Sequence, residues 1–182
     1  RLESEPEGAT KGQSYLLSDV DLASRLSFFL WGRLPDDELL ELAGKGNLTE
    51  PGGLERQVER MLADPRSEAL ATRFAAQWLR LQDLVKVQPE PFFYPDFSRQ
   101  LAEAMRRETE LLFYDIVQKD GSVLDLFTAD YTFVNDRLAR HYGIPFTGGT
   151  EFQRVRHPND DRRGLLGHAS ILVLTSLPDR TS

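Results

Sequence analysis

The chain has 182 residues, of which 40% are hydrophobic, so it can bury the core of one domain or of two small ones. Its net charge of −7 argues against nucleic acid or an anionic membrane surface as a partner, because either would need a basic face. The sequence has no cysteine, which excludes disulfides, thiolate metal sites and a c-type haem attached within this segment, and no apolar run approaches the roughly 20 residues that span a bilayer.

Helix start and stop signals recur along the first half of the chain. Ser18 is an N-cap candidate after a Glu-, Gly- and Pro-rich lead-in over residues 1–17. Arg25 lies beside the side chains that the first helix is expected to bury, which are Leu22, Leu26, Phe29 and Leu30. The signals predict helices over residues 18–31, 35–44, 51–62 and 68–81. The last of these is expected to bury one stripe of side chains: Leu70, Phe74, Gln77, Trp78 and Leu81.

The second half is built around residues 98–119, the longest run with helical periodicity and no Gly or Pro. These residues should form the central helix. Glu108 lies in the middle of its apolar face and Asp115 near the edge of that face, so two carboxyl groups point toward the expected core. Residues 82–97 precede this helix and contain three prolines around three aromatic residues, which predicts a loop.

The sequence predicts shorter elements for the rest of the chain. A helical turn over residues 122–127 is expected to lead into Tyr131 and Phe133, which should pack in the core, and then into a helix over residues 135–142 capped by Asn135. A loop-rich tail follows, with one short strand over residues 152–155 and a last helix over residues 164–174. The fold class that we predict is therefore all-α, a helical bundle of about seven helices with a loop-rich C-terminal tail.

Several motifs occur in one order and spacing: SRLSFFLW at residues 24–31, LPDDELL at 34–40, MLADPR at 61–66, FAAQWL at 74–79 and RETELLF at 107–113. Together they resemble the planctomycete-type domains of unknown function that occur beside cytochrome-c-like domains in large exported bacterial proteins. Residues 131–144 and 163–176 resemble the opening of the next domain in those proteins. The resemblance implies a helical domain over residues 18–128, followed by the start of another over residues 129–182.

The resemblance also implies a function class. It suggests a non-catalytic scaffold or interaction module of an exported protein, located in the periplasm or outside the cell and linked to c-type cytochrome domains. Its partners would be neighbouring domains of the same polypeptide, and no cofactor is expected in this segment. The chain begins with Arg1 and shows no signal-peptide pattern, from which we expect a segment of a larger protein.

The two charged residues on apolar faces admit two hypotheses. Arg25 and Glu108 would each be costly to bury alone, so a structural ion pair between them is one expectation. The alternative is an enzyme acting on a polysaccharide, with Glu108 or Asp115 as acid or base. Their spacing of two helical turns, roughly 10 Å, is near the wide end for an inverting glycosidase pair.

The three histidines are His141, His157 and His168. Ligands on one helix usually lie three or four residues apart, and no two of these do, so a metal site would need distant segments to converge. His141 and His168 are candidates for such a site. The alternative is that His141 ends its helix near the last carbonyl groups and that His168 packs inside its own helix, where Gly164 and Gly167 let another segment approach.

Overall fold

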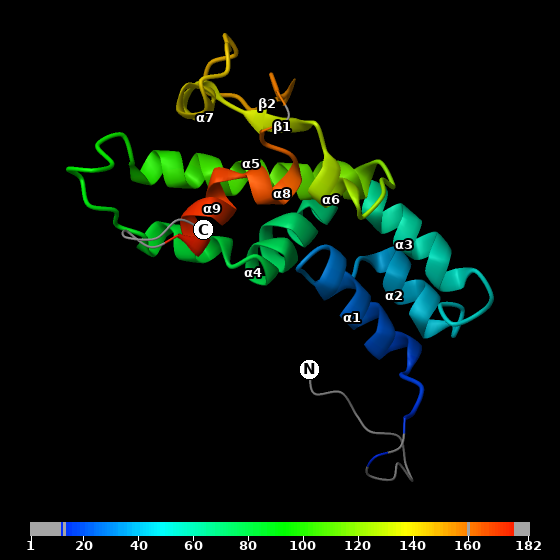
Figure 1. Ribbon diagram of the computed structural model, residues 1–182. Helices are drawn as coiled ribbons and strands as arrows, with labels where there is room; N and C mark the ends of the chain where they lie inside the picture. The colour runs from blue at the N-terminus through cyan, green and yellow to red at the C-terminus, as the bar shows by residue number, and fades with distance from the viewer. Residues whose placement is uncertain (1–11, 13, 160, 177–182) are drawn as a thin grey trace. The chain divides into compact units, whose positions relative to one another are not determined.

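The computed structural model describes residues 12, 14–159 and 161–176 (Figure 1). Most of the predicted lead-in, residues 1–11 and 13, lies outside the described residues. The described part is mostly helical and has one two-stranded antiparallel sheet, which confirms the predicted all-α class. It divides into two compact units, residues 1–70 and 71–182. Among the described residues, no helix combines the length and the apolar character that crossing a membrane requires.

The first unit contains α1 (Asp19–Leu30), α2 (Asp37–Gly44), α3 (Gly53–Ala63) and the short 3₁₀ helix η1 (Pro65–Ser67). The predicted cap of α1 is confirmed, because the Ser18 hydroxyl accepts from the Asp21 amide at 3.2 Å. Asp36 caps α2 and accepts from the Leu39 amide, also at 3.2 Å. The core side chains of this unit include Ala23, Leu30, Leu39, Leu48 and Met61.

The buried face of α1 differs from the predicted one. The residues of α1 that are buried are Asp21, Ala23, Ser27 and Leu30. Phe29 is 54% exposed, and Arg25 is exposed as well, so placing either on a buried face was wrong. The small side chains at positions 23 and 27 allow another segment to approach closely, which a count of large apolar residues does not detect.

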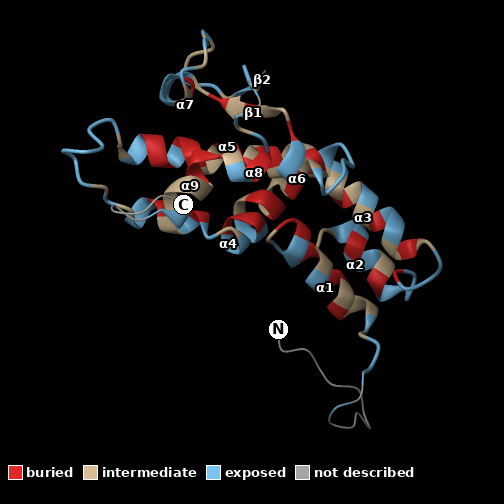
Figure 2. Ribbon diagram, viewed as in Figure 1, coloured by how far each residue is buried: buried red, intermediate tan, exposed pale blue. Residues whose placement is uncertain are grey.

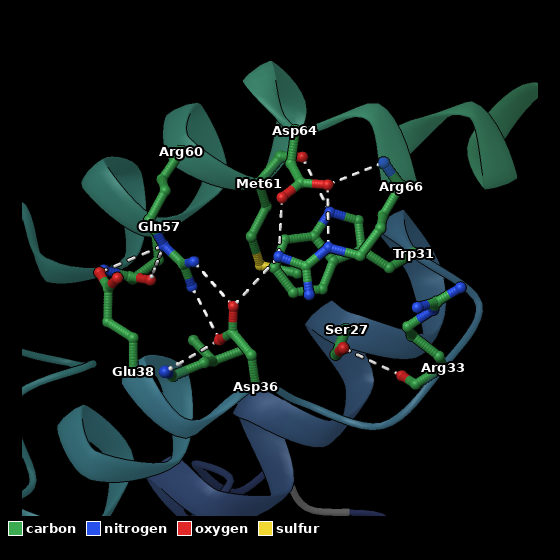
Figure 3. A network of polar contacts seen from close by, with 11 residues as sticks. Ser27, Trp31, Arg33, Asp36, Glu38, Gln57, Arg60, Met61, Asp64 and Arg66 are labelled. Carbon is green, nitrogen blue, oxygen red and sulfur yellow. Dashed lines mark hydrogen bonds and ion pairs between the residues drawn. The ribbon is translucent and has the colours of Figure 1, made fainter.

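A network of polar contacts surrounds Trp31 and connects the helices of the first unit (Figure 3). The Trp31 ring is buried and donates from Nε1 to the Met61 carbonyl at 2.9 Å. The Arg66 guanidinium lies over this ring, 3.5 Å from its centroid. Asp36 accepts from both terminal nitrogens of Arg60, at 2.8 and 3.0 Å, and from Arg66 at 3.3 Å. These contacts tie the end of α1 and the start of α2 to the end of α3.

The predicted central helix is α5 (Arg99–Gln118), and the other elements of the second unit pack around it. Its N-cap is Ser98, whose side chain accepts from the Leu101 amide at 3.2 Å. Buried residues recur along the length of α5, as the colouring of the ribbon shows (Figure 2). One side packs on β1 (Tyr131–Val134) and α7 (Asp136–Tyr142), a second on α6 (Asp125–Thr128) and α8 (Gly164–Gly167), and a third on η3 (Leu81–Lys86) and α9 (Ala169–Thr175).

The short strand predicted near residue 152 is confirmed. It is β2 (Gln153–Arg156), which pairs antiparallel with β1 so that Thr132 lies opposite Val155. Thr132 and Val134 are the buried residues of β1, whereas Tyr131 and Phe133 are half-buried, so the core positions predicted for this stretch were shifted by one residue. The predicted cap of α7 is confirmed, because the Asn135 side chain accepts from the Leu138 amide at 3.0 Å.

Two predicted helices are interrupted. The fourth contains a π-helical segment, η2 (Leu70–Ala75), before α4 (Ala76–Trp78). A π turn adds a residue to each turn, which changes the phase of the helix. Leu70 and Leu81 of the predicted stripe are buried, but Phe74 and Trp78 are 44% and 55% exposed, contrary to the prediction. The positions buried between them are Ala71, Ala75 and Ala76. The last helix is divided into α8 and α9 at His168, whose backbone is extended.

Candidate functional site

Glu108 is the centre of a buried polar cluster in the second unit. Its side chain on α5 is fully buried, as the apolar pattern around it predicts. Its carboxyl group accepts from the Thr132 hydroxyl on β1 at 2.5 Å and from the Tyr142 hydroxyl at the end of α7 at 2.6 Å. The Tyr142 hydroxyl also accepts from the Ala169 amide at 2.9 Å, which brings the start of α9 to the same place.

His168 lies beside this carboxyl group. The imidazole is 1% exposed, and its Nδ1 lies 2.9 Å from the Thr109 hydroxyl, which is in turn 2.7 Å from the Ser170 hydroxyl. The other ring nitrogen, Nε2, is 3.9 Å from Glu108 Oε1 and has no hydrogen-bond partner among the described atoms. We refer to Glu108, Thr109, Thr132, Tyr142, His168 and Ser170 as the Glu108 cluster.

Burial determines the charge state of this cluster. Desolvation raises the pKa of Glu108 to about 8, although the hydrogen bonds from Thr132 and Tyr142 act in the opposite direction. Desolvation also lowers the pKa of His168 to about 3 and raises that of Tyr142. Near neutral pH, therefore, a protonated Glu108 lies beside a neutral His168. The cluster consists of uncharged groups joined by hydroxyl hydrogen bonds, in which the oxygen of Glu108 that carries the proton acts as a donor rather than as an acceptor.

The second candidate carboxylate, Asp115, lies in a different environment. It makes an ion pair with Lys119 at 2.5 Å and accepts from the Tyr131 hydroxyl at 3.0 Å. An inverting pair needs both carboxyl groups to face one substrate across a cleft. Glu108 has no exposed surface through which a polymer could reach it. An acid or base role for Glu108 would require the unit to open, and the role of either residue in catalysis stays a prediction.

The expected ion pair between Arg25 and Glu108 joins residues of different units and stays a prediction. Within its own unit, Glu108 is bonded by hydroxyl groups, and the cation whose field acts on it is Arg162. Sequence reasoning did not identify Thr132 and Tyr142 as partners of Glu108, or Ser170 as a partner of Thr109. The alternation in β1 could have placed Thr132 on the inner face, had that stretch been read as a strand.

The candidate metal ligands are also in different surroundings. His141 is exposed on the last turn of α7, and its pKa is lowered mainly by desolvation and then by the field of Arg162. His168 is enclosed in the Glu108 cluster. Within the described part of the chain, no three His, Cys, Asp or Glu side chains are placed to hold a metal ion. A metal role for His141 or His168 therefore stays a prediction.

Comparison with known proteins gives a family. A family model described as PSD4, a protein of unknown function (DUF1592), matches residues 17–144. No curated protein and no solved structure matches the chain. The match covers most of the chain and includes residues of both units, among them Glu108, Thr132 and Tyr142. The chain therefore belongs to the PSD4 family of proteins of unknown function (DUF1592).

Proposed function

We propose that this chain is a non-catalytic helical interaction module of a larger exported bacterial protein. Its partners are neighbouring domains of the same polypeptide, and the resemblance noted in its motifs implies that c-type cytochrome domains are among them. The protein would then be located in the periplasm or outside the cell, with the haem held outside residues 1–182.

The observation that carries this proposal is the enclosure of Glu108. A catalytic carboxyl group has to reach its substrate, whereas Glu108 is fully buried and its oxygens are occupied by Thr132 and Tyr142. A buried carboxyl group bonded to hydroxyls from two other elements fixes how those elements pack. Glu108 would be the best candidate for an enzymatic acid, but its contacts give it a structural role, which is consistent with a rigid module.

Cross-linking within the full-length protein tests the proposal. Lys86 and Lys119 in the second unit have side chains that are 74% and 58% exposed. We expect an amine-reactive cross-linker to join them to lysines outside residues 1–182 at reproducible positions, as identified by mass spectrometry. Lys45 in the first unit, 60% exposed, provides a second reporter. Cross-links confined to residues 1–182 would contradict the proposed role.

A haem assay and an activity assay test the remaining parts. The full-length protein should show the absorption bands of c-type haem, while the 182-residue chain alone should not. Hydrolysis of a polysaccharide by the chain that is lost in Glu108→Gln, in a variant that remains folded, would instead support an enzyme and overturn the proposed module.

A further inference from the structure

The second unit has an open pocket of about 440 Å³ outside the Glu108 cluster. Its walls come from the loop before α5, from α5 itself and from the C-terminal ends of α7 and α9. The side chains that form its apolar surface include Phe93, Tyr94, Phe97, Leu101, Met105 and Leu172. This volume lies within the range of small-molecule sites.

The loop that forms the aromatic wall is held by its own turns. The amides of Phe93 and Tyr94 donate to the Glu90 carbonyl at 3.1 and 3.0 Å, and the amide of Phe97 donates to the Tyr94 carbonyl at 3.1 Å. Phe93 and Tyr94 remain 71% and 50% exposed. An aromatic surface that is fixed in place and left in water is typical of a binding site.

The charge on the pocket lining has one sign. Near neutral pH, only Asp96 and His141 among the described lining residues could carry a charge. Desolvation and Arg162 lower the pKa of His141, although Asp96 acts in the opposite direction, and an imidazole with a pKa below 6.5 is mainly neutral at pH 7. Arg162 does not line the pocket, although its field reaches His141; its guanidinium donates to the Gly167 carbonyl at 2.9 Å and lies over the Tyr142 ring. Asp96 is exposed at the pocket and supplies its single negative charge.

We infer that this pocket binds a small organic cation with an apolar body. The body packs against Leu101, Met105 and Leu172, and the cationic group lies near the Asp96 carboxylate and the faces of the aromatic side chains. Aromatic faces attract cations within about 6 Å of the ring centroid, and a nearby carboxylate adds to this preference. A carboxylic acid of the same shape would be repelled by Asp96 and would find no cationic partner on the described lining.

Three compounds of matched shape test the inference: 4-phenylbutylamine, 4-phenylbutanol and 4-phenylbutyrate. Their affinities for the 182-residue chain are measured at pH 7 by calorimetry and by backbone amide shifts in NMR. We expect the amine to bind about 10-fold more tightly than the alcohol and the carboxylate to bind most weakly, with the largest shifts at Leu101, Met105 and Leu172. Equal affinities, or tightest binding of the carboxylate, would overturn the inference.

A variant and its matched control distinguish the contribution of the Asp96 charge to affinity from that of the rest of the pocket. Asp96→Asn should reduce the affinity for the amine to that for the alcohol and leave the affinity for the alcohol unchanged. Asp120→Asn removes an exposed carboxylate of the same unit that does not line the pocket, and it should change neither affinity. An undiminished preference for the amine in Asp96→Asn contradicts the assigned role of Asp96.

Two other occupants give different results. If a second copy of the chain fills the pocket, sedimentation will show a dimer that all three compounds dissociate. If residues after Ser176 fill it, a chain ending at Ser176 will bind all three compounds more tightly by the same factor. Either result would overturn the inference.

Discussion

Glu108 keeps its proton at neutral pH because the interior of the second unit disfavours a carboxylate more strongly than two hydroxyl hydrogen bonds stabilise it. His168 beside it is kept neutral for the same reason. Between pH 4.5 and 6.5, where the two groups would carry opposite charges in water, they thus lie side by side without charge. The arrangement depends on how completely the surrounding elements exclude solvent.

The raised pKa of Glu108 predicts how stability depends on pH. The group has a pKa near 4.5 in the unfolded chain and about 8 in the folded one, so the folded state binds more protons between these values. Its contribution to stability is complete below pH 4.5 and is lost as the pH rises through 8. Between pH 7 and 8 the free energy of unfolding should fall by roughly 1 kcal/mol, as measured by urea titration followed by circular dichroism.

Glu108→Gln serves as the matched variant, because an amide of the same shape can still accept a hydrogen bond and does not titrate. Its free energy of unfolding should be constant between pH 7 and 8. The titration of the histidines contributes little to the change in the free energy of unfolding between pH 7 and 8. The pKa values of His141, His157 and His168 are all lowered by folding, so they act mainly below the unfolded value of 6.5, where stability falls as the pH falls. A wild-type slope that persists in Glu108→Gln would show that another group titrates.

In the first unit, Asp36 is a single residue whose carboxylate charge contributes to stability. Its hydrogen bonds with Arg60 are the main reason why its pKa is lowered to about 2. Asp36→Asn retains an N-cap side chain for α2 but removes the negative charge, so it should reduce the free energy of unfolding by about 1 kcal/mol at pH 7, after allowance for a side chain that is one-quarter exposed. Asp37→Asn, at an exposed neighbouring position, should change stability by less than about 0.5 kcal/mol. Similar losses in both variants would contradict the role of the network around Trp31.

At the scale of elements, the approach of α8 to α6 depends on Gly164. This residue has φ +53°, and an added Cβ would meet the Leu126 carbonyl oxygen and lie 2.6 Å from Phe127 Cα. Gly164→Ala should therefore reduce the free energy of unfolding by at least about 2 kcal/mol. Gly44→Ala at the end of α2 meets no atom within 4 Å and should be neutral or slightly stabilising. Thermal unfolding of both variants measures the difference, and equal melting temperatures would contradict it.

Helix ends were predictable from the sequence because capping is local. Ser18 and Asn135 each bond an amide three residues ahead, as the sequence predicts, and Ser98 does the same at the start of α5. The buried faces were less predictable because they depend on packing. The exposed positions of Arg25, Phe74 and Trp78 follow from burial of small side chains on α1 and from the π turn in η2, and neither has a distinct local pattern.

The candidate site was predictable in part for the same reason. Glu108 stands out because it is a carboxyl group on an apolar stripe, which is a property of one helix. Thr132 and Tyr142 reach it from positions 24 and 34 residues further along the chain, whereas Ser170, 62 residues further along, bonds the neighbouring Thr109. Hydroxyl side chains are compatible with either a buried or an exposed position. No spacing rule connects residues so far apart without knowledge of the fold.

At the scale of the whole molecule, the predicted boundary after residue 128 stays a prediction that truncation can test. A chain ending at residue 128 would lack Thr132, Tyr142 and His168, and it would leave Glu108 in an open interior. It would also remove β1 and α7, which cover Leu101 and Met105. We expect hydrogen exchange in α5 to become much faster in this shortened chain than in the 182-residue chain. Unchanged protection of α5 would instead support an independent domain over residues 18–128.

The chain has two tryptophans, and one lies in each unit. Trp31 is enclosed beneath Arg66 in the first unit, while Trp78 is 55% exposed in the second. The two indoles should therefore emit at different wavelengths, with Trp31 to the blue of Trp78. In a Trp78→Phe variant, tryptophan fluorescence would report on residues 1–70 alone, and in Trp31→Phe it would report on residues 71–182 alone. The chain thus contains its own optical label for asking whether the two units melt together or in sequence.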